Sequence, residues 1–292
     1  MCDQDTVNDN NEFLKRIGQL TRRQFGKLSA GAGLAMMLPS VANAMDVMEM
    51  DVNVTTPDGT ADCFFVHPVS GKHPGVIVWP DILGLRPAFR AMGKRLAESG
   101  YSVLVVNQFY RGAKAPVVPE GASFQDEATR NVVFPLAQAL NAQTHMTDAK
   151  AFISYLDQQG VVDTDRKIGT AGYCMGGPMV MRTAAAVPDR VGAGATFHGA
   201  GMATDVPDSP HLLIPNTKAH MLHAIATNDD ERDPAAKTKL REAYDKAGIP
   251  AEIEVYAGTM HGWCPPDSAV YNEAQAERAW SRMLALFEKA LA

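Results

Sequence analysis

A cysteine between glycines is the clearest chemical signal in the sequence. It lies in Gly172-Tyr173-Cys174-Met175-Gly176, which follows a short apolar run and leads into a helical pattern. This is the G-x-nucleophile-x-G pattern of a strained strand-to-helix turn, with Cys where Ser is usual. The turn lifts the side chain above the sheet, the helix dipole favours the thiolate, and the amide of Met175 can donate to an oxyanion. The alternative is a structural cysteine buried in a glycine-rich turn.

A cysteine nucleophile needs a base, and the base needs a carboxylate that orients it. His261 lies between a predicted strand and the last predicted helix, and Asp229 lies in the loop after the preceding strand. The chain order Cys, Asp, His is that of α/β-hydrolases. Asp230 is the alternative acid, because the sequence leaves the register of that loop open.

Apolar strands that alternate with helical patterns must position these residues. Strands are predicted at 75–78, 102–106, 167–170, 192–197, 219–226 and 251–256, and helices at 88–99, 146–157, 178–186, 234–247 and 273–291. Two alternating runs, 48–55 and 61–66, flank a Pro-Asp-Gly turn and predict an N-terminal antiparallel hairpin. Continuous apolar strands between helices predict an α/β fold, a mainly parallel sheet with helices on both faces. Functional side chains are then expected at the carboxyl ends of the strands.

Residues 1–44 predict an export signal. Residues 21–27 read Thr-Arg-Arg-Gln-Phe-Gly-Lys, a mildly apolar segment follows at 28–38, and Ala42-Asn43-Ala44 fits a small-x-small cleavage site. The paired arginines with the following Phe and Lys resemble a bacterial twin-arginine signal. We therefore expect recognition by the export machinery, cleavage after Ala44, a periplasmic location and one domain over residues 45–292. A disordered tail that ends in an amphipathic helix is the alternative.

Composition excludes several classes of protein. The 292 residues are 46% hydrophobic and 21% charged, with a formal net charge of −6, and no run of basic residues occurs. This balance argues against a nucleic-acid partner, and no apolar run reaches the roughly 18 residues that a transmembrane helix needs. We expect no metal and no cofactor. The oligomeric state is not specified by the sequence, and a monomer is favoured.

The cysteine count bears on the compartment. Cys2 would leave with the signal, so that Cys63, Cys174 and Cys264 remain. An odd number leaves at least one thiol without a disulfide, and a twin-arginine substrate folds where thiols are reduced. Disulfides are therefore not expected to hold the fold.

The elbow, Asp229, His261-Gly262 and the segment Trp79-Pro80-Asp81-Ile82-Leu83-Gly84 together resemble the dienelactone hydrolase family. The match in order and spacing covers essentially all of residues 45–292, and the cysteine elbow is its most specific element. The resemblance implies an α/β-hydrolase fold and a Cys174-His261-Asp229 triad. It also implies a small-molecule ester or lactone as substrate, cleaved through a thioester acyl-enzyme.

The resemblance also implies roles around the triad. Asp81 matches an acidic residue that contacts the resting thiol in that family. The alternative is that Asp81 is a loop residue that caps the next helix. The next amide, that of Ile82, would join Met175 as an oxyanion donor. Arg111 matches an arginine that binds the substrate carboxylate in muconate-type lactonases. A second such arginine, expected shortly after His261, is missing.

Two further side chains are candidates for the pocket. His198 stands after a predicted strand where relatives often carry Tyr, and it either lines the pocket or hydrogen-bonds locally. Trp263 follows His261 closely and would add an aromatic wall if it faces inward, and a place in the core is the alternative.

Two other functions stay open at the level of sequence. Cys264 lies three residues after His261, so a disulfide with Cys174 would make this a thiol–disulfide or redox-gated protein. No C-x-x-C motif supports that reading. The other alternative is a non-catalytic binding domain on a hydrolase scaffold, which would have no need of all three triad residue types.

Overall fold

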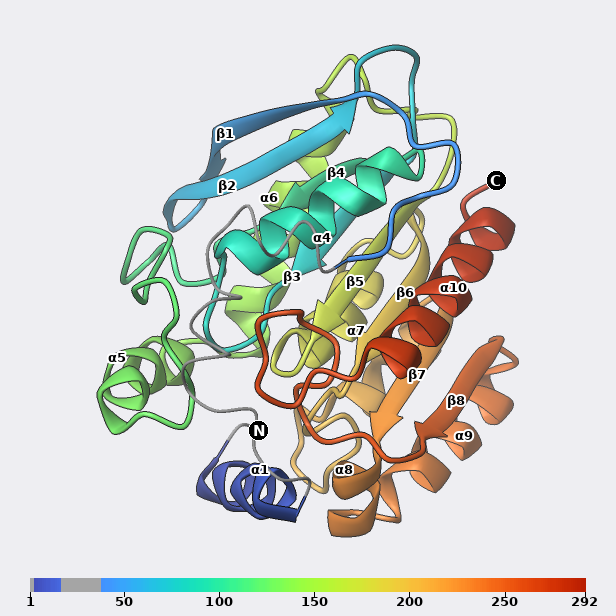
Figure 1. Cartoon of the computed structure of the whole chain (residues 1–292). Coiled ribbons are helices and arrows are strands. Elements are labelled where there is room, and N and C mark those ends of the chain that lie inside the picture. The colour runs from blue at the N-terminus through green and yellow to red at the C-terminus, as the bar shows by residue number, and fades with distance from the viewer. Residues whose placement is uncertain (1–2, 17–37) are drawn as a thin grey trace.

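An eight-stranded sheet organises the chain (Figure 1). The computed structural model describes residues 3–16 and 38–292. The strands are β1 (Val47–Thr56), β2 (Gly59–Pro68), β3 (Gly75–Trp79), β4 (Ser102–Val105), β5 (Ile168–Tyr173), β6 (Val191–Phe197), β7 (His220–Ala226) and β8 (Ala251–Tyr256). Their order is β1-β2-β4-β3-β5-β6-β7-β8. The β1–β2 hairpin is antiparallel, β2 pairs antiparallel with β4, and the remaining pairs are parallel. The predicted α/β-hydrolase fold and its N-terminal hairpin are confirmed.

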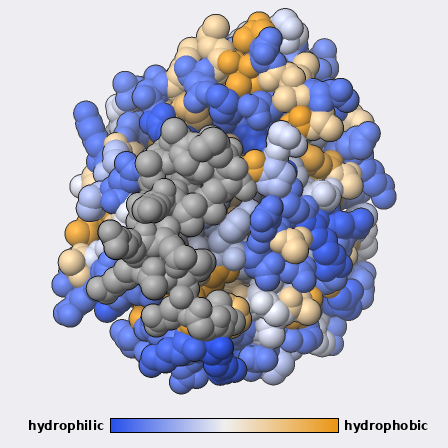
Figure 2. Space-filling model, in the orientation of Figure 1, coloured by the Kyte–Doolittle hydropathy of each residue, from blue (hydrophilic) through white to orange (hydrophobic). Residues whose placement is uncertain are grey.

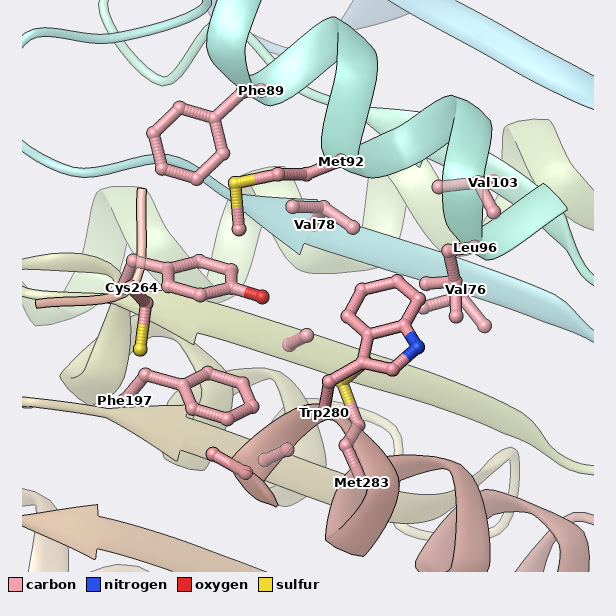
Figure 3. Close-up of a cluster of buried hydrophobic side chains, with 14 of the residues drawn as sticks. Val76, Val78, Phe89, Met92, Leu96, Val103, Phe197, Cys264, Trp280 and Met283 are labelled. Atoms are coloured by element: carbon pink, nitrogen blue, oxygen red, sulfur yellow. The ribbon is translucent and has the colours of Figure 1, made fainter. Parts of the chain in front are cut away.

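Helices bury both faces of this sheet. On one face lie α4 (Pro87–Glu98) and α10 (Glu273–Ala290), and on the other lie α6 (Ala142–Asp157), α7 (Gly176–Ala186) and α9 (Ala236–Ala247). Figure 3 shows the first interface, where Phe89, Met92 and Leu96 of α4 pack near Trp280 and Met283 of α10. Burying each such side chain stabilises the folded state by about 1.5–3 kcal/mol. Strands that are apolar on both faces therefore need a layer of helices on each side of the sheet, as the sequence predicted.

Helix boundaries follow local capping. The helix α6 begins at Ala142, before the predicted residue 146, because Asn141 and Thr144 form a capping box. Gly248 ends α9 with φ +66°, a conformation that glycine adopts without strain.

Four elements were not predicted from the sequence. They are α1 (Gln4–Arg16), α5 (Glu127–Gln138), the 3-10 helix η1 (Pro210–Asn216) and the short helix α8 (Thr227–Arg232). The helix α1 lies in the segment predicted as a leader, and it lies beside α8 (Figure 1). The predicted twin-arginine motif, residues 21–27, lies outside the described residues. The predicted cleavage site at 42–44 lies in an exposed turn.

The surface seen from the side of Figure 1 is mainly hydrophilic where residues are described (Figure 2). Within residues 3–16 and 38–292, no helix combines the length and the apolar character needed to cross a bilayer. The same residues contain no group of three or more His, Cys, Asp or Glu side chains arranged to hold a metal ion.

Candidate active site

The elbow holds Cys174 in a strained conformation between β5 and α7. Its φ is +53°, which a residue with a side chain rarely adopts. A Cβ on Gly172 would lie 2.2 Å from the Gly176 carbonyl oxygen, and one on Gly176 would lie 2.4 Å from that of Trp79. Both glycines are therefore required by close backbone approach, as the sequence pattern implied.

His261 contacts Asp229 and not Asp230. Its Nδ1 lies 2.8 Å from Oδ2 and 2.9 Å from Oδ1 of Asp229, which is in the first turn of α8. Asp230 accepts instead from Lys237 Nζ at 2.6 Å. The backbone N–H of His261 donates to Asn228 Oδ1 at 2.8 Å, which fixes the loop that carries the ring. The geometry thus separates the two acids that the sequence left open.

The electrostatics of His261 favour its charged form. Burial lowers the pKa of this histidine, but the Asp229 carboxylate and Cys174, both hydrogen-bonded to it, raise the pKa to about 10. The imidazole is therefore protonated at neutral pH. A protonated ring that is hydrogen-bonded to Cys174 favours a thiolate there.

The loop after β3 brings Ile82 to the same edge as the elbow. Strand β3 pairs with β5 so that Trp79 lies opposite Gly172, and Ile82 packs in one apolar cluster with Cys174 and Met175. Gln108 donates from Nε2 to the Asp81 carbonyl oxygen at 2.8 Å, which fixes this loop. The amides of Ile82 and Met175 thus belong to two segments that meet beside the thiol.

Asp81 is held by a residue that the sequence did not single out. Arg86 donates from Nη1 and Nη2 to Asp81 at 2.7 and 3.0 Å, and from Nε and Nη2 to Asp267 at 2.6 and 2.9 Å. Burial raises the pKa of Asp81 while Arg86 lowers it, and the net result is a raised pKa. Asp81 lines the cleft that contains Cys174, and its side chain pairs with Arg86. The contact with the resting thiol that the resemblance implies stays a prediction. An arginine directly before a helix start opposes the helix dipole, and this is the sequence signal from which a tertiary partner for Arg86 could have been inferred.

His198 lines the same cleft. It follows β6 with φ +41°, is completely buried, and its ring centroid lies 5.1 Å from that of His261. Within residues 3–16 and 38–292, neither of its ring nitrogens has a hydrogen-bond partner. Burial and the neighbouring His261 charge hold the pKa of His198 well below its ordinary value, so the ring is neutral.

Trp263 lies behind His198 and is not part of the cleft lining. It stacks on Tyr256 with ring centroids 4.9 Å apart, and its ring lies 6.3 Å from that of His198. The expectation that Trp263 forms an aromatic wall is corrected, because the stack on Tyr256 holds its ring in the core.

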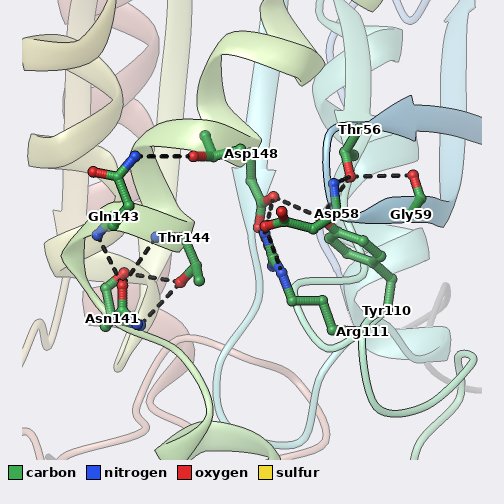
Figure 4. Close-up of polar contacts among 10 residues, drawn as sticks. Thr56, Asp58, Gly59, Tyr110, Arg111, Asn141, Gln143, Thr144 and Asp148 are labelled. Atoms are coloured by element: carbon green, nitrogen blue, oxygen red, sulfur yellow. Dashed lines mark hydrogen bonds and ion pairs between the residues drawn. The ribbon is translucent and has the colours of Figure 1, made fainter.

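Arg111 is not brought to this cleft either. Figure 4 shows its guanidinium beside Asp148 and Asp58, to which it donates at 2.6–3.0 Å. Tyr110 donates to Asp148 at 2.8 Å in the same cluster. The carboxylate-binding role expected for Arg111 is corrected, because these two carboxylates engage its Nε and both Nη atoms at another place in the fold.

The space in the cleft around Cys174, together with the open solvent at its mouth, is about 670 Å³. Its walls are the loop after β3, residues 122–125, the loop after β8 and helix α1. From α1, Thr6 and Val7 are buried in it, and Asn10 donates from Nδ2 to the His261 carbonyl oxygen at 3.3 Å. The sequence carried no signal for this contact.

Cys264 lies in the core and not beside Cys174. Figure 3 shows it near Phe197 in the apolar cluster between α4 and α10, and burial raises the pKa of its thiol well above the ordinary value. No disulfide is formed among the cysteines of the described segments. A Cys174–Cys264 redox pair therefore has no support in the geometry.

Comparisons with known proteins point to one family. The sequence profile of the dienelactone hydrolase family matches residues 61–291. A carboxymethylenebutenolidase from Rhodococcus opacus is 25% identical over 240 residues, which cover 80% of this chain and 88% of that protein.

Solved structures share the fold. A dienelactone hydrolase-like promiscuous phosphotriesterase from metagenomic libraries superposes with a TM-score of 0.70 at 19% identity, covering 84% of this chain and 99% of that one. A dienelactone hydrolase from Anabaena variabilis gives a TM-score of 0.61 at 14% identity, with the same coverage of each chain.

Proposed function

Because the chain belongs to the dienelactone hydrolase family and is a carboxylic ester hydrolase, we propose that it cleaves an ester or lactone with Cys174 as nucleophile. The observation that carries the proposal is the hydrogen-bonded series from Asp229 through His261 to Cys174 at the start of α7. A nucleophile, a base and an orienting carboxylate in this order are what acyl transfer requires.

The proposed cycle has two halves. In the first, the sulfur of Cys174 attacks the carbonyl carbon, and the amides of Ile82 and Met175 hold the oxyanion, which contributes about 3–4 kcal/mol per donor in comparable sites. The proton of His261 then passes to the leaving alkoxide, so that an alcohol departs and a thioester remains. In the second half, His261 takes a proton from water, the hydroxide attacks the thioester, and the acid and the thiolate are released.

The pH dependence follows from the charge of His261. An alkyl ester with a poor leaving group needs a proton from this ring, and the ring loses its proton only near pH 10. We expect kcat/KM for such an ester to stay high through neutral pH and to fall near pH 10. In Cys174→Ser the thiolate no longer raises the pKa of His261, so residual activity should rise with pH. An alkaline limb near pH 7 in the unmodified protein would contradict the assignment.

A panel of esters and lactones tests the function itself. We expect hydrolysis of uncharged activated esters and of lactones, and we expect iodoacetamide to abolish it in step with alkylation of Cys174. The absence of hydrolysis across the panel, or activity that survives complete alkylation of Cys174, would refute the proposal.

We further propose that the protein is exported by the twin-arginine route and is cleaved after Ala44. The exposed turn at 42–44 supports this, because a peptidase needs an accessible segment. N-terminal sequencing of protein recovered from the periplasm should begin at Met45, whereas an intact N-terminus there would reject the cleavage.

A further inference from the structure

The arginine that lines the cleft, Arg86, has no N–H group left to donate to a substrate. Arg86 is the one lysine or arginine among the described residues that line it. A guanidinium has five N–H groups, and here two go to Asp81, two to Asp267 and one to the Gly84 carbonyl oxygen. Any anion that enters the cleft therefore meets two carboxylates and a saturated arginine.

The other groups of the cleft do not supply a replacement. His198 is neutral, and the charged His261 is engaged by Asp229 and Cys174. Arg111 is held by Asp58 and Asp148 outside the cleft. Desolvating a carboxylate without a paired cation is costly, and like charges nearby increase the cost.

We propose that this cleft selects uncharged esters and lactones and discriminates against substrates that carry a carboxylate. The selection rests on the proposed function, and it names the substrate class of that same site. The two ring nitrogens of His198, which have no hydrogen-bond partner in the described part of the chain, fit this class, because a neutral imidazole can donate to or accept from an uncharged polar group.

Two substrates of nearly equal shape measure the selection. Para-acetoxybenzamide carries an uncharged amide where para-acetoxybenzoate carries a carboxylate, and the two esters are otherwise the same. The kcat/KM for each ester is divided by the rate constant for its hydrolysis by hydroxide, which corrects for their different intrinsic reactivity. We expect the full chain to prefer the amide by at least about tenfold. Raising the ionic strength should narrow the preference, because it screens the repulsion of the anion.

Variants locate the effect in the cleft. Asp267→Asn removes one carboxylate from Arg86, and we expect it to reduce the preference at least about threefold. Asp189→Asn removes the same charge from an exposed pair with Lys218 near the amino end of β6, and it should leave the preference unchanged. Thermal unfolding of both variants shows whether each is folded. The effect of ionic strength is measured on the unmodified chain, so that it tests the selection even if a variant does not fold.

Equal use of the two substrates by the unmodified chain would overturn the selection, as would equal effects of Asp267→Asn and Asp189→Asn. Failure of the proposed function is a different outcome, namely that neither substrate is hydrolysed.

A second inference concerns helix α1 and rests on a separate set of contacts. Asp9 pairs with Arg232 at 2.5 Å and accepts from Asn228 Nδ2 at 3.2 Å. Asn228 also holds the backbone of His261, so α1 is joined to the segment that carries the base. On the inner side of the helix, Val7 is buried against the cleft with 4% of its surface exposed.

We infer that α1 sets the size of the acyl group that the full chain accepts, with Val7 as the specificity-determining side chain. This also rests on the proposed function. Cleavage after Ala44 would remove this wall, and the processed protein would then accept larger esters.

A shortened chain tests this directly. All eight strands begin at or after Val47, and the buried members of the three apolar core clusters all lie at or after Val54. Among the described residues before Met45, only the partly buried Leu38 packs against one of these clusters, so a chain from Met45 keeps the sheet and nearly all of the core. We expect its preference for para-nitrophenyl octanoate over the acetate to exceed that of the full chain by at least about tenfold, since the steric limit is gone.

Point variants in the full chain give a matched control. Val7→Glu places a charge where Val7 is buried against the cleft, which should displace α1. We expect it to raise the preference for the octanoate over the acetate, as the shortened chain does. Asn8→Glu introduces the same side chain at an exposed position and should not. The inference is wrong if the shortened and full chains show the same octanoate-to-acetate ratio, whereas a complete lack of activity in both would reject the proposed function instead.

Discussion

Replacing Cys174 by alanine is expected to lower kcat/KM for para-nitrophenyl acetate by at least about 10⁴-fold. The substitution removes the nucleophile, and no described side chain of the cleft can take over a thioester mechanism. Because the substitution only removes a sulfur atom, the unfolding transition should stay close to that of the unmodified protein. Steady-state hydrolysis and urea unfolding measure the two effects.

Cys264→Ala is the matched control for this prediction. It removes the same atom from another buried cysteine, which packs in the core beside Phe197 and Trp280. We expect this variant to lose about 1 kcal/mol of stability and to keep its activity within a few fold. Equal loss of activity in both variants would mean that packing, and not nucleophilic chemistry, explains the first result.

The second large effect is expected for Asp229→Asn, which should lower kcat for an alkyl ester by about 10²–10⁴-fold. Asparagine keeps the shape of the side chain, but it no longer stabilises the imidazolium of His261. The pKa of His261 should therefore fall, and the alkaline limb of the pH profile should move to lower pH.

Asp230→Asn provides the comparison within the same short helix. Asp230 pairs with Lys237 and not with His261, so Asp230→Asn removes only this ion pair. The energy of a surface ion pair corresponds to a factor of about three, and we expect kcat to change by less than this factor. If Asp230→Asn were the more damaging change, the orientation of His261 would have to be assigned to the other carboxylate.

The fold and the elbow were predictable because their signals are local. Apolar runs of strand length and the glycines around Cys174 each reflect constraints within a few residues of sequence. The choice between Asp229 and Asp230 was not predictable, because it depends on how α8 packs against His261 and Lys237.

Long-range pairing explains the other differences. Arg86 meets Asp267 across 181 positions of sequence, and Arg111 meets Asp148 of α6 and Asp58 of the turn between β1 and β2. Helix α1 reaches His261 through Asn10 across 251 positions. Such contacts depend on tertiary packing, and the residue types alone do not specify them.

Identification of the acylated residue tests the central claim most directly. The reaction with para-nitrophenyl acetate is quenched in acid within the first turnovers, and the protein is digested and measured by mass spectrometry. We predict one acetyl group on the peptide that contains Cys174, released by hydroxylamine as expected for a thioester, and absent from Cys174→Ala. An acetyl group on another residue that forms and decays at the rate of turnover would contradict the account.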